Sequence, residues 1–178
     1  MADCPFHGSP IQLREANRLR LLEIDRVVSL CLGEGEPGPV LDVGTGSGLF
    51  AEAFAQGGAP VLGIDLRRDM AQAAKQVLGP SHVVVGDMHR LPLKPRSFEL
   101  GFLGLVLHET PVPDVLLYEV GRVCRRVAVL EWPYVQEEMG PPFGHRLSHE
   151  AVLYAAREAG FHRREATPLS HMVLYRFV

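Results

Sequence analysis

The residues best suited to ligand chemistry are three glycines at every second position, Gly44, Gly46 and Gly48. They follow the short apolar run 40–43 and precede a segment of helical character. Because glycine adopts backbone conformations that other residues avoid, such a turn lets backbone amides and a helix N-terminus approach a polar or anionic ligand. The pattern therefore predicts a site for a nucleotide-like cofactor.

The glycine spacing differs from the dinucleotide fingerprint G-x-G-x-x-G, whose third glycine packs the helix on the strand. Here the pattern is D-x-G-x-G-x-G, with Asp42 inside the expected strand. It resembles motif I of the class I S-adenosylmethionine (SAM)-dependent methyltransferases, in which the glycines lie under the methionine part of SAM. The resemblance implies that Asp42 reaches the loop or the amino group of the cofactor, and that Thr45 belongs to the same cofactor site.

A second acidic residue, Asp65, closes the next apolar run. It lies about twenty residues past the glycine loop, as expected of a ribose-binding acid, and its two oxygens match the two hydroxyls of a ribose. We expect Asp65 and the following Leu66 to contact the cofactor. The alternative role for Asp65 is to cap the next helix.

Two further segments agree with this resemblance in order and spacing. The resemblance implies that Asp87 binds the exocyclic amine of adenine and that Met88 packs on the adenine ring. The alternative is that Asp87 is a turn residue and Met88 lies on the surface. The resemblance also implies that Leu103 and Gly104 pass a backbone carbonyl near the amino group of SAM.

His108 follows that segment and is the candidate catalytic residue. A histidine there suits a general base or a group that orients the substrate. The alternative is a histidine that caps a helix or bonds the backbone. Further along, Glu131 and Trp132 either line the acceptor pocket or finish the sheet.

Alternating strands and helices predict the architecture. The expected strands are 40–43, 61–65, 82–85, 98–103 and 127–132, followed by a hairpin over 163–178. The expected helices are 13–32, 48–56, 69–78, 114–126 and one that begins after Ser148 and ends near Gly160. They predict a Rossmann-like three-layer α/β/α sandwich with a mostly parallel seven-stranded sheet. Its antiparallel C-terminal strand is a feature that the resemblance implies.

The chain of 178 residues predicts a single methyltransferase domain, 1–178, in which the helical segment 1–36 borders the acceptor site. Arg14, Arg18 and Arg20 on the first helix either meet an anionic acceptor or form a solvated face. A small-molecule acceptor is expected, with SAM converted to S-adenosylhomocysteine (SAH). The open site leaves room for a lid from a homodimer partner.

Composition narrows the function classes. A net charge of −3 argues against a nucleic-acid partner, and no apolar run approaches membrane-spanning length. Cys4, Cys31 and Cys124 are too few and too scattered for a disulfide framework, so we expect a reducing cytoplasm. No metal site is predicted. Two alternative functions remain, an NAD-binding Rossmann oxidoreductase and a non-catalytic SAM-binding protein.

Overall fold

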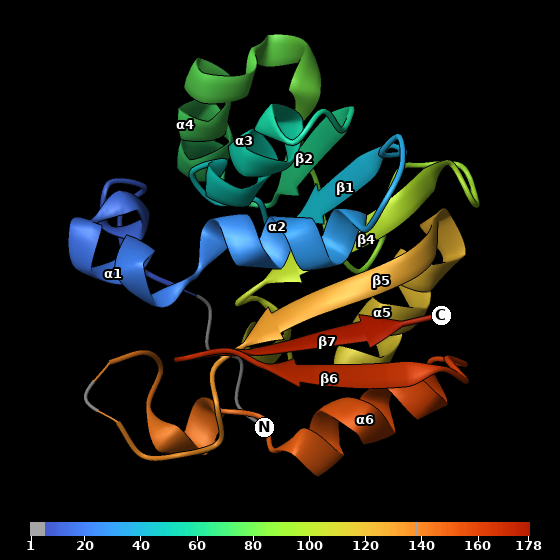
Figure 1. Ribbon diagram of the computed structural model, residues 1–178. Helices are drawn as coiled ribbons and strands as arrows, with labels where there is room; N and C mark the ends of the chain where they lie inside the picture. The colour runs from blue at the N-terminus through green and yellow to red at the C-terminus, as the bar shows by residue number, and fades with distance from the viewer. Residues whose placement is uncertain (1–5, 138) are drawn as a thin grey trace.

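A seven-stranded sheet forms the centre of the computed structural model, which describes residues 6–137 and 139–178 (Figure 1). Its strand order is β3-β2-β1-β4-β5-β7-β6. The strands are β1 (Val40–Val43), β2 (Val61–Asp65), β3 (Val83–Val85), β4 (Phe98–Gly104), β5 (Cys124–Glu131), β6 (Arg164–Pro168) and β7 (Val173–Phe177). Strands β1 to β5 pair in parallel, and β7 runs antiparallel to both β5 and β6. The predicted fold class is confirmed.

Helices cover both faces of this sheet (Figure 1). On one face lie α2 (Ile24–Leu32), α3 (Leu49–Gln56) and α4 (Arg68–Leu78), and on the other lie α5 (Pro113–Val123) and α6 (His149–Glu158). The short elements are α1 (Ala16–Leu21) and the 3₁₀ turns η1 (Gln12–Arg14), η2 (Pro80–His82), η3 (Leu107–Glu109) and η4 (Phe143–His145). Buried apolar side chains fill a core on each face. Each helix thus buries one apolar stripe, which is the main source of its stability.

The predicted helix over 13–32 is wrong, because the chain breaks it into α1 and α2. The break is at Glu23, whose φ of 42° is left-handed and cannot continue an α-helix. The Glu23 carboxylate accepts hydrogen bonds from Arg26 Nη1 at 2.9 Å and from the backbone N–H of Ser170 at 2.5 Å. The Glu23 side chain therefore anchors the turn between β6 and β7. The left-handed backbone of Glu23 lets the preceding segment turn away from the axis of α2.

The predicted boundary between the helix over 114–126 and the following strand is also wrong. Helix α5 ends at Val123 and Cys124 already begins β5. Cys124 pairs with Phe98 of β4, and Arg126 pairs with Leu100. Strand pairing with β4 thus decides the conformation of three residues that helical periodicity alone assigns to the helix.

Other local predictions are confirmed. Strands β1 and β2 have the predicted bounds, and the C-terminal hairpin forms. Ser148 caps α6, since its side chain accepts a hydrogen bond from the N–H of Ala151 at 3.2 Å. Cys31 and Cys124 are buried free thiols, and Cys4 lies outside the described residues.

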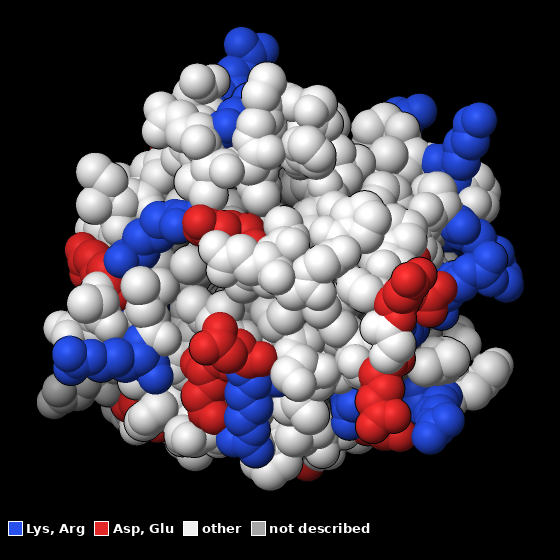
Figure 2. Space-filling model, turned by 45° about the horizontal axis from the view of Figure 1, so that its top comes forward, with Lys and Arg blue, Asp and Glu red and all other residues white. Residues whose placement is uncertain are grey.

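The surface mixes charges of both signs. Figure 2 shows acidic and basic side chains interspersed over the face viewed there, in keeping with a formal net charge of −3. No helix in the described part of the chain has both the length and the apolar character needed to cross a membrane.

Candidate functional site

The candidate site lies where the carboxyl ends of the parallel strands meet. Strand β1 pairs with β2 on one side and with β4 on the other, so the strand order reverses between β1 and β4. In open α/β sheets, ligands bind outside the carboxyl ends of the strands at such a switch point. The predicted site residues lie near these ends, either in the last residues of β1, β2 and β4 or in the turns that follow β1, β2, β3 and β4.

The glycine loop between β1 and α3 needs glycine at three positions. Gly44, Gly46 and Gly48 have φ values of 68°, 55° and 78°, which side chains strongly disfavour. A Cβ on Gly44 would lie 2.6 Å from Cγ2 of Val106, and a Cβ on Gly46 would lie 2.8 Å from Cδ1 of Leu13. The loop is therefore shaped by close approach as well as by backbone conformation.

Asp42 supports this loop from beneath. It is the third residue of β1 and is 2% exposed. Its Oδ2 accepts a hydrogen bond from the Thr45 hydroxyl at 2.7 Å. Burial raises the pKa of Asp42 to about 7, although the Thr45 hydrogen bond works to lower it. Asp42 is expected to reach either the loop or the amino group of the cofactor. The structure shows the contact with the loop.

Asp65 links the ends of β1 and β2. Its Oδ2 accepts a hydrogen bond from the N–H of Gly46 at 2.8 Å, and its Oδ1 accepts one from the N–H of Arg67 at 2.9 Å. The second bond lies before α4, whose N-cap residue is Arg67 and has no side-chain cap, so the helix-capping role given as the alternative for Asp65 is wrong. Burial raises the pKa of Asp65. Each carboxylate oxygen keeps a lone pair for a ligand hydroxyl.

Leu66, directly after Asp65, is 69% exposed. An apolar side chain this open beside a polar loop is suited to contact with a flat ring.

Asp87 and Met88 follow β3 at the same edge of the sheet. The Asp87 carboxylate accepts hydrogen bonds from the N–H of His89 at 2.8 Å, as in a turn, and its side chain stays 54% exposed. Met88 is not on the surface as its alternative role proposes, because it is half-buried and packs against the core.

Strand β4 ends in a strained turn. Leu103 is buried within the strand, and Gly104 is its last residue. Leu105 follows with a φ of 62°, a left-handed conformation that costs a residue with a side chain about 1–2 kcal/mol. Such strain tends to be kept at functional sites. The sequence gives no signal for it.

The N-terminal segment lies across the glycine loop. Arg14 donates to the backbone carbonyl of Ser47 at 3.0 Å and pairs with Glu52 at 2.8 Å. Arg67 donates to the backbone carbonyl of Phe6 at 2.6 Å. Together with the contact between Leu13 and Gly46, these bonds hold residues 6–14 over the site. For Arg14 the solvated-face prediction is wrong, because its guanidinium is bound to the loop.

His108, the predicted catalytic residue, lies in η3 just beyond β4. Its Nδ1 is 2.9 Å from Oε2 and 3.0 Å from Oε1 of Glu131, the last residue of β5. Burial works to lower the pKa of His108, but the charge and hydrogen bond of Glu131 outweigh it, so the pKa is raised. The sequence offers Glu131 as a residue that lines the acceptor pocket or finishes the sheet, and it gives no sign of this pairing.

Arg18 of α1 and Glu109 lie near enough to His108 for their charges to act on its pKa. Burial lowers the pKa of the half-buried Arg18, while the nearby Glu109 carboxylate works to raise it. Burial also raises the pKa of Glu109, against the lowering effect of His108. Arg18 is therefore part of the site, and the solvated-face prediction is wrong for it too, whereas Arg20 is exposed as predicted.

A family model described as "Methyltransferase domain" matches residues 41–130, from β1 to β5. The chain belongs to the SAM-dependent methyltransferase family. The family match begins in β1 directly before the glycine loop and includes the ends of β2, β3 and β4.

Two curated methyltransferases show the range of its relatives. The chain is similar to a malonyl-[acyl-carrier protein] O-methyltransferase of Serratia marcescens, at 30% identity over 102 residues, which are 57% of this chain and 40% of the relative. It is also similar to a demethylmenaquinone methyltransferase of Renibacterium salmoninarum, at 27% identity over 166 residues, which are 92% of this chain and 66% of the relative. The first curated relatives are matched over less than half of their own length.

A solved methyltransferase has the same fold. The crystal structure of a SAM-dependent methyltransferase from Aquifex aeolicus superposes with a TM-score of 0.80 at 24% identity, covering 96% of this chain and 98% of that one.

SAM is the cofactor of this family, and the residues present fit it. The glycine loop offers a cradle that a Cβ would fill at Gly44 and Gly46. Within the described residues, the buried Ser47 hydroxyl of that loop has no hydrogen-bond partner. The carboxylates of Asp42, Asp65 and Glu109 suit a cationic ligand. In the same part of the chain, no group of three or more His, Cys, Asp and Glu side chains could hold a metal ion.

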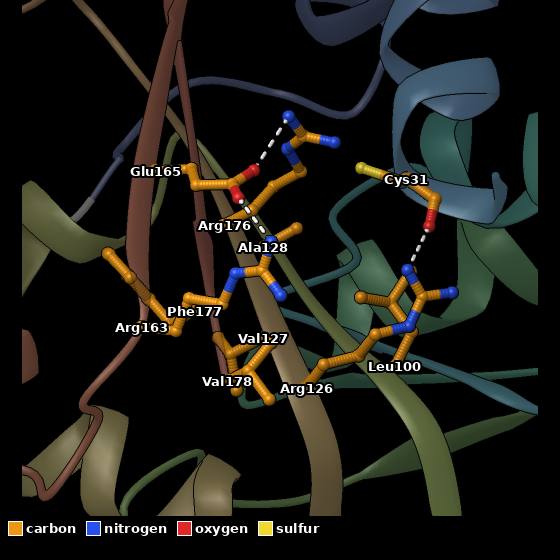
Figure 3. A pocket seen from close by; sticks show the side chains of 10 residues that line it. All are labelled: Cys31, Leu100, Arg126, Val127, Ala128, Arg163, Glu165, Arg176, Phe177 and Val178. Carbon is orange, nitrogen blue, oxygen red and sulfur yellow. Dashed lines mark hydrogen bonds and ion pairs between the residues drawn. The ribbon is translucent and has the colours of Figure 1, made fainter.

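A separate cavity of about 160 Å³ opens at the opposite edge of the methyltransferase sheet (Figure 3). Glu165 lies between Arg163 and Arg176 there, at 3.2 Å and 3.1 Å. Arg126 donates to the backbone carbonyl of Cys31 at 2.6 Å. Arg126 and Arg176 therefore hold the carbonyl end of α2, and Arg163 and Arg176 pair with the Glu165 carboxylate.

Proposed function

We propose that this chain transfers the methyl group of SAM to a small-molecule acceptor. One observation carries the proposal: the glycine loop is fastened to Asp65 by the hydrogen bond from Gly46 N–H at 2.8 Å. This bond places the backbone amides of the loop, the ribose-type carboxylate and the start of α3 around one space. It belongs to the cofactor site that the family implies.

We propose that the cofactor site is made of residues in and directly after the ends of β1, β2, β3 and β4. They are Asp42, Gly44, Thr45, Gly46, Gly48, Asp65, Leu66, Asp87, Met88, Leu103 and Gly104. When bound, SAM supplies a methyl group on a sulfonium, which a nucleophile attacks from the side opposite the sulfur. The chain then has only to align the acceptor and exclude water. Residues 6–14, which lie over the loop, suit the second task.

His108 is the proposed catalytic residue. Its ring lies in η3 next to the strained end of β4, and its Nδ1 is held by Glu131. The held ring leaves Nε2 to act on the acceptor. The absence of a larger catalytic constellation fits a reaction whose donor is already activated.

The names of the relatives indicate which classes of acceptor to consider. One acts on demethylmenaquinone and another on a malonyl group carried by a protein. We infer a small or carrier-bound organic acceptor, and a cytoplasmic location and a homodimer stay predictions. The NAD alternative loses support, because the loop spacing and the family match favour SAM. A non-catalytic SAM-binding role stays as the second candidate.

Binding and turnover test the proposal. Calorimetry and thermal unfolding are measured with SAM, SAH and NAD, because a ligand that binds only the folded state raises its stability by mass action. We expect stabilisation by SAM and SAH and none by NAD. Stabilisation by NAD alone would contradict the proposal. SAM binding without methyl transfer to any small molecule of a broad panel would favour the non-catalytic role.

A further inference from the structure

His108 and Glu131 form a closely bonded pair across two strand ends. They are 23 residues apart in the sequence, and the strand order brings them together. A carboxylate only accepts hydrogen bonds, so the Nδ1 that faces it at 2.9 Å carries the proton. In the neutral ring the other nitrogen, Nε2, then holds the free lone pair. The pair therefore fixes the form of the imidazole that can accept a proton at Nε2.

The Glu131 side chain is built into place. It is 2% exposed, and it also accepts hydrogen bonds from the N–H of His108 at 3.0 Å and from its neighbour Trp132 N–H at 3.2 Å. Within the described residues, His108 is the basic side chain that pairs with it. Burying a carboxylate costs free energy unless a cation pairs with it. When Nε2 of His108 accepts a proton, the ring becomes an imidazolium, which is the cation that Glu131 otherwise lacks.

Three charged side chains, each from a different element, act on His108. Glu131 comes from β5, Glu109 from η3 and Arg18 from α1. Behind Glu131, Tyr175 of β7 faces its carboxylate. Arg18 adds a guanidinium near His108, and a positive charge there favours an acceptor that becomes negative and disfavours one that carries an ammonium.

We propose that Glu131 is a positioning residue that makes His108 a general base, and that the acceptor group is a weakly acidic hydroxyl, such as a phenol or an enol. This inference rests on the proposed methyltransferase function. A carboxylate acceptor is already ionised near neutral pH and needs no base. An imidazole supports attack by a hydroxyl that must lose its proton as the new bond forms.

The step balances in atoms and charge. The Nε2 lone pair of His108 takes the proton of the acceptor hydroxyl while the hydroxyl oxygen forms a bond to the methyl carbon. The electron pair of the broken carbon–sulfur bond stays on sulfur, which leaves SAH. His108 becomes an imidazolium paired with Glu131 and later releases the proton to water. Arg18 stabilises the negative charge that develops on the oxygen.

The first test needs no acceptor, and its result is read from the wild-type pair. The chain has eight histidines, and the ring signals of His108 are assigned by their loss in His108→Asn. Nitrogen–proton correlation spectra of the wild-type ring are recorded at high pH. We expect the proton on Nδ1 and a bare Nε2. A ring that carries its proton on Nε2 would overturn the proposal.

The second test separates positioning by Glu131 from the general field of nearby acids. Glu131→Gln is expected to lower the proton affinity of His108 by about tenfold or more, which is one pKa unit. Glu109→Gln is the matched control, because this carboxylate is near His108 but the structure gives no hydrogen bond from His108 to it. Its effect is expected to be clearly smaller. Equal effects of the two variants would overturn the assignment of Glu131.

The third test addresses the acceptor. Methyl transfer from SAM is measured to catechol, to 1,4-naphthalenediol and to benzoate. We expect transfer to at least one hydroxyarene, a loss of about 100-fold or more in kcat for His108→Asn, and an unchanged KM for SAM. In Glu131→Gln the rise of kcat with pH is expected to shift to lower pH. Transfer to neither hydroxyarene would overturn the acceptor class.

Binding of SAM and SAH separates a failure of the proposed function from a failure of the further inference. If the wild type binds neither SAM nor SAH in calorimetry, the proposed function fails. If the wild type binds both ligands but the pKa of His108 is the same in Glu131→Gln as in the wild type, only the further inference fails.

Discussion

Two carboxylates at the ends of neighbouring strands divide the work of holding the glycine loop. Asp42 is buried under the loop and bonds the Thr45 hydroxyl, whereas Asp65 reaches the Gly46 amide from the side. The pKa of each is raised chiefly by burial. Their different contacts predict different consequences of substitution. We expect Asp65 to border the ligand and Asp42 to act on the stability of the loop.

Asp65→Ala is expected to weaken SAH binding about 10- to 100-fold, because hydrogen bonds to a charged group contribute about 1.5–3 kcal/mol. The variant loses the acceptor for the Gly46 and Arg67 amides as well as the proposed ribose contact. Calorimetry with SAH measures the effect. Asp25→Ala, at an exposed position of α2, is the control. An unchanged dissociation constant would remove Asp65 from the cofactor site.

Asp42→Asn tests the cost of the buried carboxylate. The folded-state pKa of about 7 lies above the ordinary value of 3.8, so between these values the folded chain keeps a proton that the unfolded chain has lost. The free energy of unfolding therefore falls as pH rises through this window, by about 1.4 kcal/mol per pKa unit as an upper bound. Asparagine does not titrate, so the variant should gain stability relative to the wild type as pH rises.

Urea unfolding between about pH 4 and about pH 8 measures that difference. We expect it to change by a few kcal/mol in favour of Asp42→Asn. A constant difference across the window would mean that Asp42 stays ionised in the folded protein.

At the scale of elements, the break at Glu23 decides what covers the site. The chain leaves α2 there, so that η1 and α1 extend toward the glycine loop, where Leu13 and Arg14 contact it. Apolar periodicity continues through Leu21, Leu22 and Ile24, and for this reason the sequence predicts one helix. The Glu23 contact with Ser170 is 147 residues away in sequence and has no local signal. Tertiary contacts therefore override periodicity at this point.

The strand ends show the opposite case. Asp65 could be placed from the sequence because it ends a short apolar run, whereas Asp87 and Gly104 are expected there from the family resemblance, and parallel strands bring such ends to one edge. The pair of His108 and Glu131 could not be placed, since it depends on β4 and β5 being neighbours. Composition and spacing along the chain carry no information on that distance.

Arg14→Ala is expected to loosen the N-terminal segment. Its guanidinium joins η1 to Ser47 and Glu52, and the loss of two half-buried polar contacts is expected to speed SAM dissociation about 3- to 10-fold. Hydrogen exchange over residues 6–14 should also become faster, and mass spectrometry measures it. Arg20→Ala is the matched control, because Arg20 is an exposed arginine of α1. Equal exchange in both variants would show that Arg14 does not hold the segment.

At the scale of the whole molecule, buried and half-buried acids gather at the carboxyl edge of the sheet. Asp42, Asp65, Glu109 and Glu131 lie there together with Arg18, while Glu165 lies among Arg126, Arg163 and Arg176 in the cavity at the other edge (Figure 3). The pKa values of Asp42, Asp65 and Glu109 are all raised, first of all by burial. In the protein alone burial therefore disfavours the ionised forms of these acids, and a cation beside them would favour those forms.

This arrangement predicts that SAM binding depends on pH more steeply than SAH binding. SAM brings a sulfonium charge that SAH lacks, so SAM should lower the raised pKa values further and release more protons. By linkage, the SAM affinity should rise between about pH 5 and about pH 8, by at most about tenfold per pH unit for each proton released, and the ratio of SAM to SAH affinity should rise with it. Calorimetry in buffers of different ionisation enthalpy counts the protons. Asp65→Asn removes one of the titrating acids and should flatten the rise. If the ratio of the two affinities stays constant with pH, the acids at this edge do not face the sulfonium, and the donor lies elsewhere on the sheet.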